Sequence, residues 1–242
     1  MSVFASLVEH LAQLLEPLFD TAATAAAIVL FTALVRLAIH PLSRAAARGA
    51  KARAKLQPKI AELRKKHGKN PERMQKAFME LHAAEKVSPF SGCLPTLLQM
   101  PAFFLMYHLF SNTQIGGEAN ELLDHSLFAA PLGSRWADAL ADGGAFGPSG
   151  RVYMALFLIV TVVATINYRR TRKQMSTAGT PSAPGMAGMA KLLPLMSFMT
   201  LLTVAAVPLA AALYVVTSTT WSCVERGFLY RDMPQAAVAA AA

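Results

Sequence analysis

A long apolar run near the start of the chain contains a single charged side chain. From Thr21 to Ile39 every residue is Ala, Ile, Val, Leu, Phe or Thr except Arg36. A run of this length and composition predicts a transmembrane helix. An arginine at the centre of a bilayer costs about 2.5–3.5 kcal/mol or more. Two explanations are open: Arg36 snorkels to the interface, roughly 6 Å away at His40-Pro41, or it faces a water-filled cavity within the membrane.

The composition extends this interpretation to the whole chain. With 54% hydrophobic and 15% charged residues, the sequence is too apolar for an ordinary soluble domain. The formal net charge of +9 is concentrated in residues 42–90, which hold thirteen Lys/Arg against four Glu, while the remaining residues balance at ten each. Such a block predicts a face for anionic partners: lipid headgroups, nucleic acid or the cytoplasmic side of a membrane.

Apolar runs, prolines and changes in charge divide the chain into ten segments, and the fold class is predicted to be an all-α polytopic membrane protein. The first segment is amphipathic, so it either lies in the interface or packs on the spans. Pro41 is expected to close the first span. The predicted segments are an external amphipathic helix (1–20), span 1 (21–41), a cytoplasmic basic helical hairpin (42–90), span 2 (91–112), an external loop (113–150), span 3 (151–168), a cytoplasmic linker (169–190), span 4 (191–208), span 5 (209–226) and a cytoplasmic tail (227–242).

The basic segment carries the signals of two helices joined by a turn. Gly68 is a typical helix stop, and Asn70 before Pro71 indicates an N-cap followed by proline at the first helical position. Apolar residues recur at helical spacing on both sides of this turn, so the two helices are expected to pack along those faces.

The distribution of Lys and Arg predicts the orientation. Twenty of these residues fall on the cytoplasmic side when Lys191 and Arg226, at the ends of spans 4 and 5, are included, and only Arg135 and Arg151 fall on the external side. The positive-inside rule then predicts a multi-pass plasma-membrane protein with its N-terminus outside and its C-terminus in the cytoplasm.

Sequence motifs for catalysis, metal binding or phosphate binding are absent, so no enzymatic activity, cofactor or metal is predicted. The two cysteines are expected to be packing residues. Polar residues within the spans are individually more typical of helix–helix hydrogen bonds than of a site. Together with Arg36 they could line a hydrophilic groove that opens to the cytoplasm. The polar residues within the spans are Gln99, Asn167, Thr217, Ser218, Thr219, Thr220 and Ser222.

Three motifs in this order resemble those of the YidC/Oxa/Alb family of membrane protein insertases, in its short, five-span bacterial type. The first is Val35-Arg36-Leu37 followed by His40-Pro41-Leu42, and the basic hairpin comes next. The strongest is Ser88-Pro89-Phe90-Ser91-Gly92-Cys93-Leu94-Pro95-Thr96-Leu97-Leu98-Gln99-Met100-Pro101. Pro208, Leu213-Tyr214 and Ser218-Thr219 then resemble the final span of the family. The resemblance covers about residues 20 to 231.

The resemblance implies a membrane protein insertase and chaperone that needs no nucleotide. It also implies that Arg36 lies in a groove open to cytoplasm and lipid but closed to the outside, with Gln99, Asn167, Ser218 and Thr219 as further groove residues. The implied partners are nascent membrane proteins, the Sec translocon, the ribosome through the basic hairpin, and anionic lipid.

Two other classes of function remain open from the residues alone. One is a small transporter or anion channel that uses Arg36 as its binding charge, although no inverted repeat is evident. The other is a membrane scaffold whose basic hairpin tethers ribosomes or anionic lipid. Only in the scaffold would Arg36 be dispensable.

Overall fold

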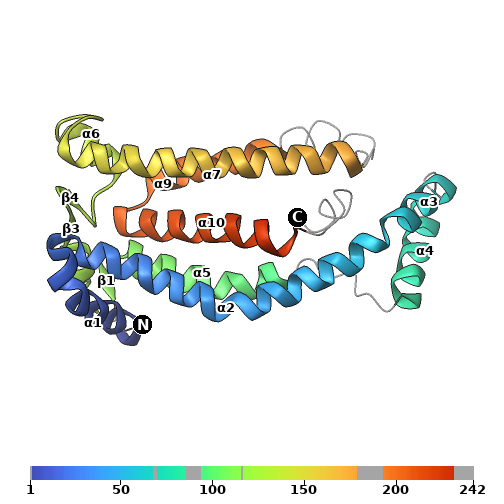
Figure 1. The fold of residues 1–242 in the computed structure, drawn as a ribbon, viewed down its shortest axis with the longest axis horizontal. Coiled ribbons are helices and arrows are strands. Elements are labelled where there is room, and N and C mark those ends of the chain that lie inside the picture. The colour runs from blue at the N-terminus through green and yellow to red at the C-terminus, as the bar shows by residue number, and fades with distance from the viewer. Residues whose placement is uncertain (1, 68–69, 86–93, 116, 179–192, 232–242) are drawn as a thin grey trace.

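Helices make up almost all of the structure, a computed structural model that describes residues 2–67, 70–85, 94–115, 117–178 and 193–231. The predicted all-α class is therefore confirmed (Figure 1). The helical elements are α1 (Ser2–Phe19), η1 (Asp20–Ala22), α2 (Ala23–Lys55), α3 (Gln57–His67), α4 (Pro71–Ala84), α5 (Leu94–Ser111), η3 (Glu121–Leu123), α6 (Trp136–Ala141), α7 (Pro148–Ala178), η4 (Leu193–Phe198), α9 (Met199–Ala206) and α10 (Leu209–Leu229).

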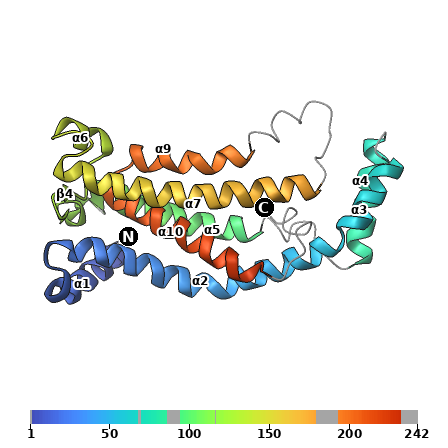
Figure 2. The same ribbon diagram turned by 45° about the horizontal axis from the view of Figure 1, so that its top comes forward.

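The long helices run alongside one another, and α10 lies between α2 and α7 (Figures 1 and 2). α10 contacts α2, α5, α7 and α9. Its first half, from Leu209 to Val216, is buried on every side, and this makes α10 the central element of the core. Among the described residues, two helical stretches are long and apolar enough to cross a membrane, Ser6–Ala52 and Pro148–Lys173, and Pro194–Ala206 is a shorter apolar one.

α2 passes through Pro41 without ending, so this proline, predicted to close the first span, does not end the helix that contains it. The helix continues to Lys55, and its 33 residues span about 50 Å. Proline removes only one backbone donor, and helices in membranes tolerate that loss where neighbouring groups satisfy the freed carbonyl. α2 therefore extends well beyond a hydrocarbon layer of about 30 Å and carries the first basic residues on the same rigid element as Arg36.

Two further helix boundaries differ from the prediction. α7 continues to Ala178, so the first part of the predicted linker at 169–190 is helical. The reason is local, because residues 169–178 include neither proline nor glycine. The fourth apolar segment begins as the 3₁₀ helix η4 before α9, and the 3₁₀ rise of about 2 Å per residue lengthens this short segment.

The basic helices α3 and α4 lie side by side at one end of the bundle (Figure 1). The predicted N-cap of α4 is confirmed: the Asn70 side chain accepts a hydrogen bond of 3.1 Å from the Arg73 backbone N–H, and Pro71 occupies the first turn. Leu56 and Ile60 are buried, and Lys59 forms an ion pair with Glu85.

The region between α5 and α7 is folded rather than loop-like. It contains two short antiparallel pairs, β1 (Gln114–Ile115) with β2 (Glu118–Ala119) and β3 (Ser126–Leu127) with β4 (Ala130–Pro131). Each strand is only two residues long, too short to leave an alternating pattern in the sequence.

This folded region caps two helix ends. The backbone N–H groups of Leu209 and Ala210, at the start of α10, donate to the carbonyls of Ser134 and Leu132 at 2.9 Å each. The Asn120 side chain donates to the carbonyls of Leu109 and Asn112 at the end of α5, at 2.9 and 2.8 Å. The first and last backbone groups of a helix lack partners within it, so these bonds hold α5 and α10 in place.

α1 packs on α2 with one face and leaves another exposed. Val8 is fully buried, and the Phe4 ring meets the Phe31 ring edge-on with centroids 6.4 Å apart. Leu14 and Leu18 are 73% and 78% exposed. The two interpretations of this helix are therefore compatible, because one apolar stripe packs on the span while the second is free to enter an interface.

Candidate functional site

Arg36 meets Ser218 across the interface between α2 and α10. The Arg36 Nε–H donates to Ser218 Oγ at 3.0 Å, and Nη2 donates to the same oxygen. Ser218 is 4% exposed, and Arg36 is half-buried. The Tyr214 side chain also hydrogen-bonds Ser218. The arginine head is thus fixed inside the helix bundle, beside a helix that is 182 residues away in sequence.

The electrostatic partners of Arg36 are few. The salt bridges between described residues are His40 with Glu225 and Lys59 with Glu85, so Arg36 has no carboxylate in direct contact within this part of the chain. Glu225 attracts its charge from farther away, while Arg226 repels it. A neutral serine hydroxyl satisfies part of the guanidinium without neutralising it, and its other N–H groups remain able to bind an anion.

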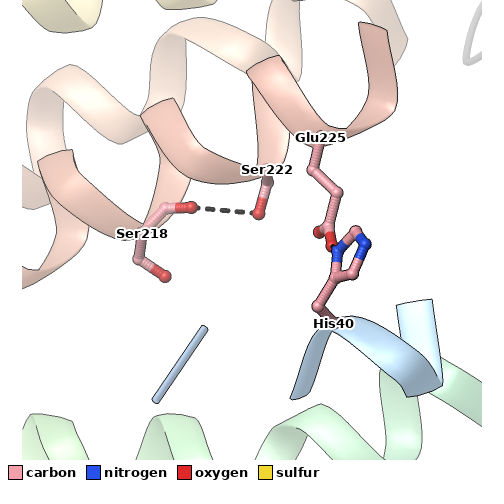
Figure 3. A network of polar contacts seen from close by, with 4 residues as sticks. All are labelled: His40, Ser218, Ser222 and Glu225. Atoms are coloured by element: carbon pink, nitrogen blue, oxygen red, sulfur yellow. Dashed lines mark hydrogen bonds and ion pairs between the residues drawn. The ribbon is translucent and has the colours of Figure 1, made fainter. Parts of the chain in front are cut away.

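A second polar contact joins the two helices one turn further along α2 and two turns further along α10. His40 Nδ1 and Glu225 Oε1 lie 2.5 Å apart, and the two side chains point toward one another from the two helices (Figure 3). On α10, Ser222 donates to the Ser218 carbonyl at 3.0 Å, between the two contacts. Arg36 and His40 are four residues apart on α2, so the contacts form a ladder along one helix face.

The other residues predicted for the groove have different outcomes. The Thr219 hydroxyl donates to the Val215 and Val216 carbonyls of its own helix, at 2.8 and 3.1 Å. Asn167 is half-buried on α7, and no hydrogen bond between described residues joins Asn167 or Thr219 to Arg36. The backbone of Gln99 is helical in α5, but its side chain lies outside the described part.

Two interhelical contacts were missed from the sequence. One is the His40–Glu225 pair, because each residue alone resembles an ordinary interface residue. The other joins α7 to α10: Arg170 Nη1 donates to the Cys223 carbonyl at 2.8 Å. A Cβ at Gly227 would lie 3.1 Å from Arg170 Nη2, so the glycine makes room for this arginine. Cys223 is 5% exposed, which confirms its predicted packing role, whereas Cys93 lies outside the described residues.

The structure is a bundle of apolar helices, and it holds a half-buried arginine that no carboxylate of the described residues contacts. These features are typical of integral membrane proteins with a polar contact between their helices. The model of the 60Kd inner membrane protein family matches residues 15–236. The match covers nearly the whole chain, and the protein therefore belongs to this family.

Individual relatives support the same assignment over shorter stretches. A protein of Magnetococcus marinus is 46% identical over 81 residues, which cover 34% of this chain and 15% of the relative. A protein of Clostridium perfringens is 43% identical over 91 residues, or 37% of this chain and 38% of the relative. A Geobacter sulfurreducens protein is 41% identical over 81 residues, covering 34% and 15%. Each is named membrane protein insertase YidC. The aligned part is therefore well under half the length of each relative.

Proposed function

We propose that this protein is a membrane protein insertase that moves short polar tails of nascent proteins across the membrane and releases their apolar segments into lipid. The observation that carries the proposal is the arginine at position 36, which is half-buried between two spans and has no carboxylate in contact among the described residues. Membership of the 60Kd inner membrane protein family and relatives named as insertases support it. These names do not favour the transporter or scaffold alternatives.

The proposed mechanism follows from the charge of Arg36. An acidic tail must cross an apolar layer of about 30 Å, and a groove that admits water partway shortens this barrier. Arg36 supplies a counter-charge where the dielectric constant is low. Its attraction for a carboxylate is therefore stronger there than it would be in water. The apolar part of the client then partitions sideways into lipid. The hydrophobic transfer free energy, roughly 25 cal/mol per Å² of apolar surface removed from water, drives this step. No bond is made or broken.

The proposal includes a topology and a set of partners. We infer five spans, with the N-terminus outside, the region from 113 to 150 external, and α3 and α4 in the cytoplasm as a basic hairpin. The asymmetry of Lys and Arg supports this orientation. The basic surface of α3 and α4 suits binding of a ribosome or anionic lipid near the mouth of the groove. The Sec translocon is a further proposed partner. Gln99, Asn167 and Thr219 are proposed to line the groove beside Arg36 and Ser218.

The test varies the charge of the client and of residue 36 together. The purified protein is reconstituted in vesicles, and translated single-span clients carry zero to three acidic residues in their external tails. Arg36→Ala is expected to lower protease protection of the tail roughly tenfold for the most acidic client and little for the neutral one. Arg36→Lys should retain most of the insertion, because it keeps a point charge at this position.

Arg48→Ala is the matched control, since Arg48 is an exposed arginine on the same helix. It should insert every client as the wild type does. Equal insertion by wild type and Arg36→Ala across the charge series would remove Arg36 from the mechanism. Failure of the wild type to insert any client would overturn the insertase proposal itself.

A further inference from the structure

A second concave site lies along α10. Side chains of α2, α7 and α10 enclose a groove of about 930 Å³. On α10 its lining residues Leu213, Val216, Thr220 and Val224 recur every three or four positions and so share one helix face. Arg36 and Ser218 are not part of the lining. This groove is therefore distinct from the Arg36 contact, although it shares two helices with it.

The walls of the groove are apolar and open to the surroundings of the bundle. Val29 of α2 is 39% exposed, Ile159 of α7 is 42% exposed, and Val224 of α10 is 54% exposed. α2 and α7 are long and apolar enough to cross a membrane, so in the proposed topology hydrocarbon rather than water meets these side chains. An apolar ligand that fills the groove would extend the packing of the bundle.

One end of the groove is basic. Arg44 lines it and is exposed, and no salt bridge between described residues involves it. Glu225 also lies at this end, but His40 occupies its carboxylate. Arg44 thus leaves an unneutralised positive charge at the mouth, where an anionic group is favoured.

Thr220 and Trp221 line the groove between the charged mouth and the apolar interior. They lie five and four residues before Glu225, or about 6–8 Å deeper along the helix. Protein covers Thr220 Oγ1 and Trp221 Nε1, so these two side chains contribute wall surface to the groove and no exposed hydrogen-bond donor.

We propose that this groove binds one anionic diacyl phospholipid. Its phosphate binds Arg44, and its acyl chains lie against Leu213 and Val216. The distance along α2 from Val29 to Arg44 is about 22 Å, which accommodates one leaflet's headgroup and acyl chain. The proposal depends on the membrane location of the helices and not on insertion activity.

The chain offers a built-in reporter, because its two tryptophans are at positions 136 and 221. In Trp136→Phe, Trp221 is the only indole, and bromine on an acyl chain quenches an indole only when the two are close together. Vesicles of phosphatidylcholine receive small amounts of brominated phosphatidylglycerol or brominated phosphatidylcholine. We expect saturable quenching by the phosphatidylglycerol at mole fractions where the phosphatidylcholine has little effect.

Arg44→Ala should raise the mole fraction of phosphatidylglycerol needed for half-quenching roughly fivefold. Arg48→Ala, which removes an exposed arginine outside the groove lining, should leave it unchanged. Native mass spectrometry with both tryptophans intact gives a second measurement, in which phosphatidylglycerol stays bound to the wild type and less of it to Arg44→Ala.

Three outcomes would overturn the proposal. Equal quenching by the two brominated lipids would show only contact with bulk lipid. Fluorescence that no brominated lipid quenches would show that protein fills the groove, and a dimer in the mass spectrum would identify a second copy as the occupant. An equal effect of Arg44→Ala and Arg48→Ala would show a diffuse basic surface instead of a site.

Discussion

At the scale of single residues, the structure resolves what holds the one charge of the first apolar helix. Arg36 has a partner within the bundle, because Ser218 Oγ on the neighbouring helix accepts hydrogen bonds from two of its N–H groups. Serine satisfies the geometry of the guanidinium and leaves its charge in place. A serine partner therefore leaves Arg36 able to bind a transient anion. A carboxylate partner would not, since the resulting ion pair would already be neutral.

Ser218→Ala should destabilise the protein, because it removes the acceptor of a partly buried charged group. A loss of about 1.5–3 kcal/mol corresponds to a fall of roughly 3–12 °C in the unfolding midpoint, measured by thermal unfolding in detergent. Thr219→Ala is the matched control, since that hydroxyl bonds only to carbonyls of its own helix. An unfolding midpoint equal to that of the wild type in Ser218→Ala would show that the contact contributes nothing to folding.

At the scale of elements, the ends of helices explain how the bundle is held together. The buried start of α10 donates hydrogen bonds to the folded region between α5 and α7, and the Asn120 side chain of that region donates to carbonyls at the end of α5. Leu132, Leu209 and Ala210 are fully buried, so water cannot replace such bonds. The basic pair α3 and α4 lies beyond the bundle and depends on local signals instead, the clearest of which is the Asn70 cap.

Asn70→Ala should loosen α4 without changing the bundle. Loss of the cap is expected to destabilise the helix by about 1 kcal/mol, which raises the rate of hydrogen exchange roughly fivefold in the amides of the first turns of α4. Asn70→Asp retains a capping oxygen and should exchange as the wild type does. Slow exchange in Asn70→Ala would mean that packing against α3, and not the cap, determines the stability of α4.

At the scale of the whole molecule, the two ends of the helix bundle differ in charge and in the kind of structure they carry. α2 and α7 are both longer than a bilayer core and extend at the same end into basic sequence. The opposite end is the folded region between α5 and α7, in which exposed Phe146 and Phe128 suit a membrane interface. The two ends therefore differ in charge, as the proposed orientation requires.

Labelling of single cysteines from the two sides of the membrane tests this orientation. With Cys93 and Cys223 replaced by Ala, a cysteine at exposed Ala137 in α6 should react with an impermeant maleimide in intact cells. A cysteine at exposed Lys66 in α3 should react only after the membrane is opened. The reverse pattern would invert the topology, and labelling of both from outside would contradict the five-span proposal.

Local patterns in the sequence determined the helical class, the membrane character, the Asn70 cap and the unusual position of Arg36, because each depends on residues within a few turns of one another. Only the tertiary structure decided that Arg36 meets Ser218, that His40 meets Glu225 and that Arg170 meets Cys223. These contacts depend on the rotation and axial offset of two helices, which the periodicity of either helix leaves open. Pro41 shows the same limit in reverse, since a residue that usually ends a helix lies inside α2.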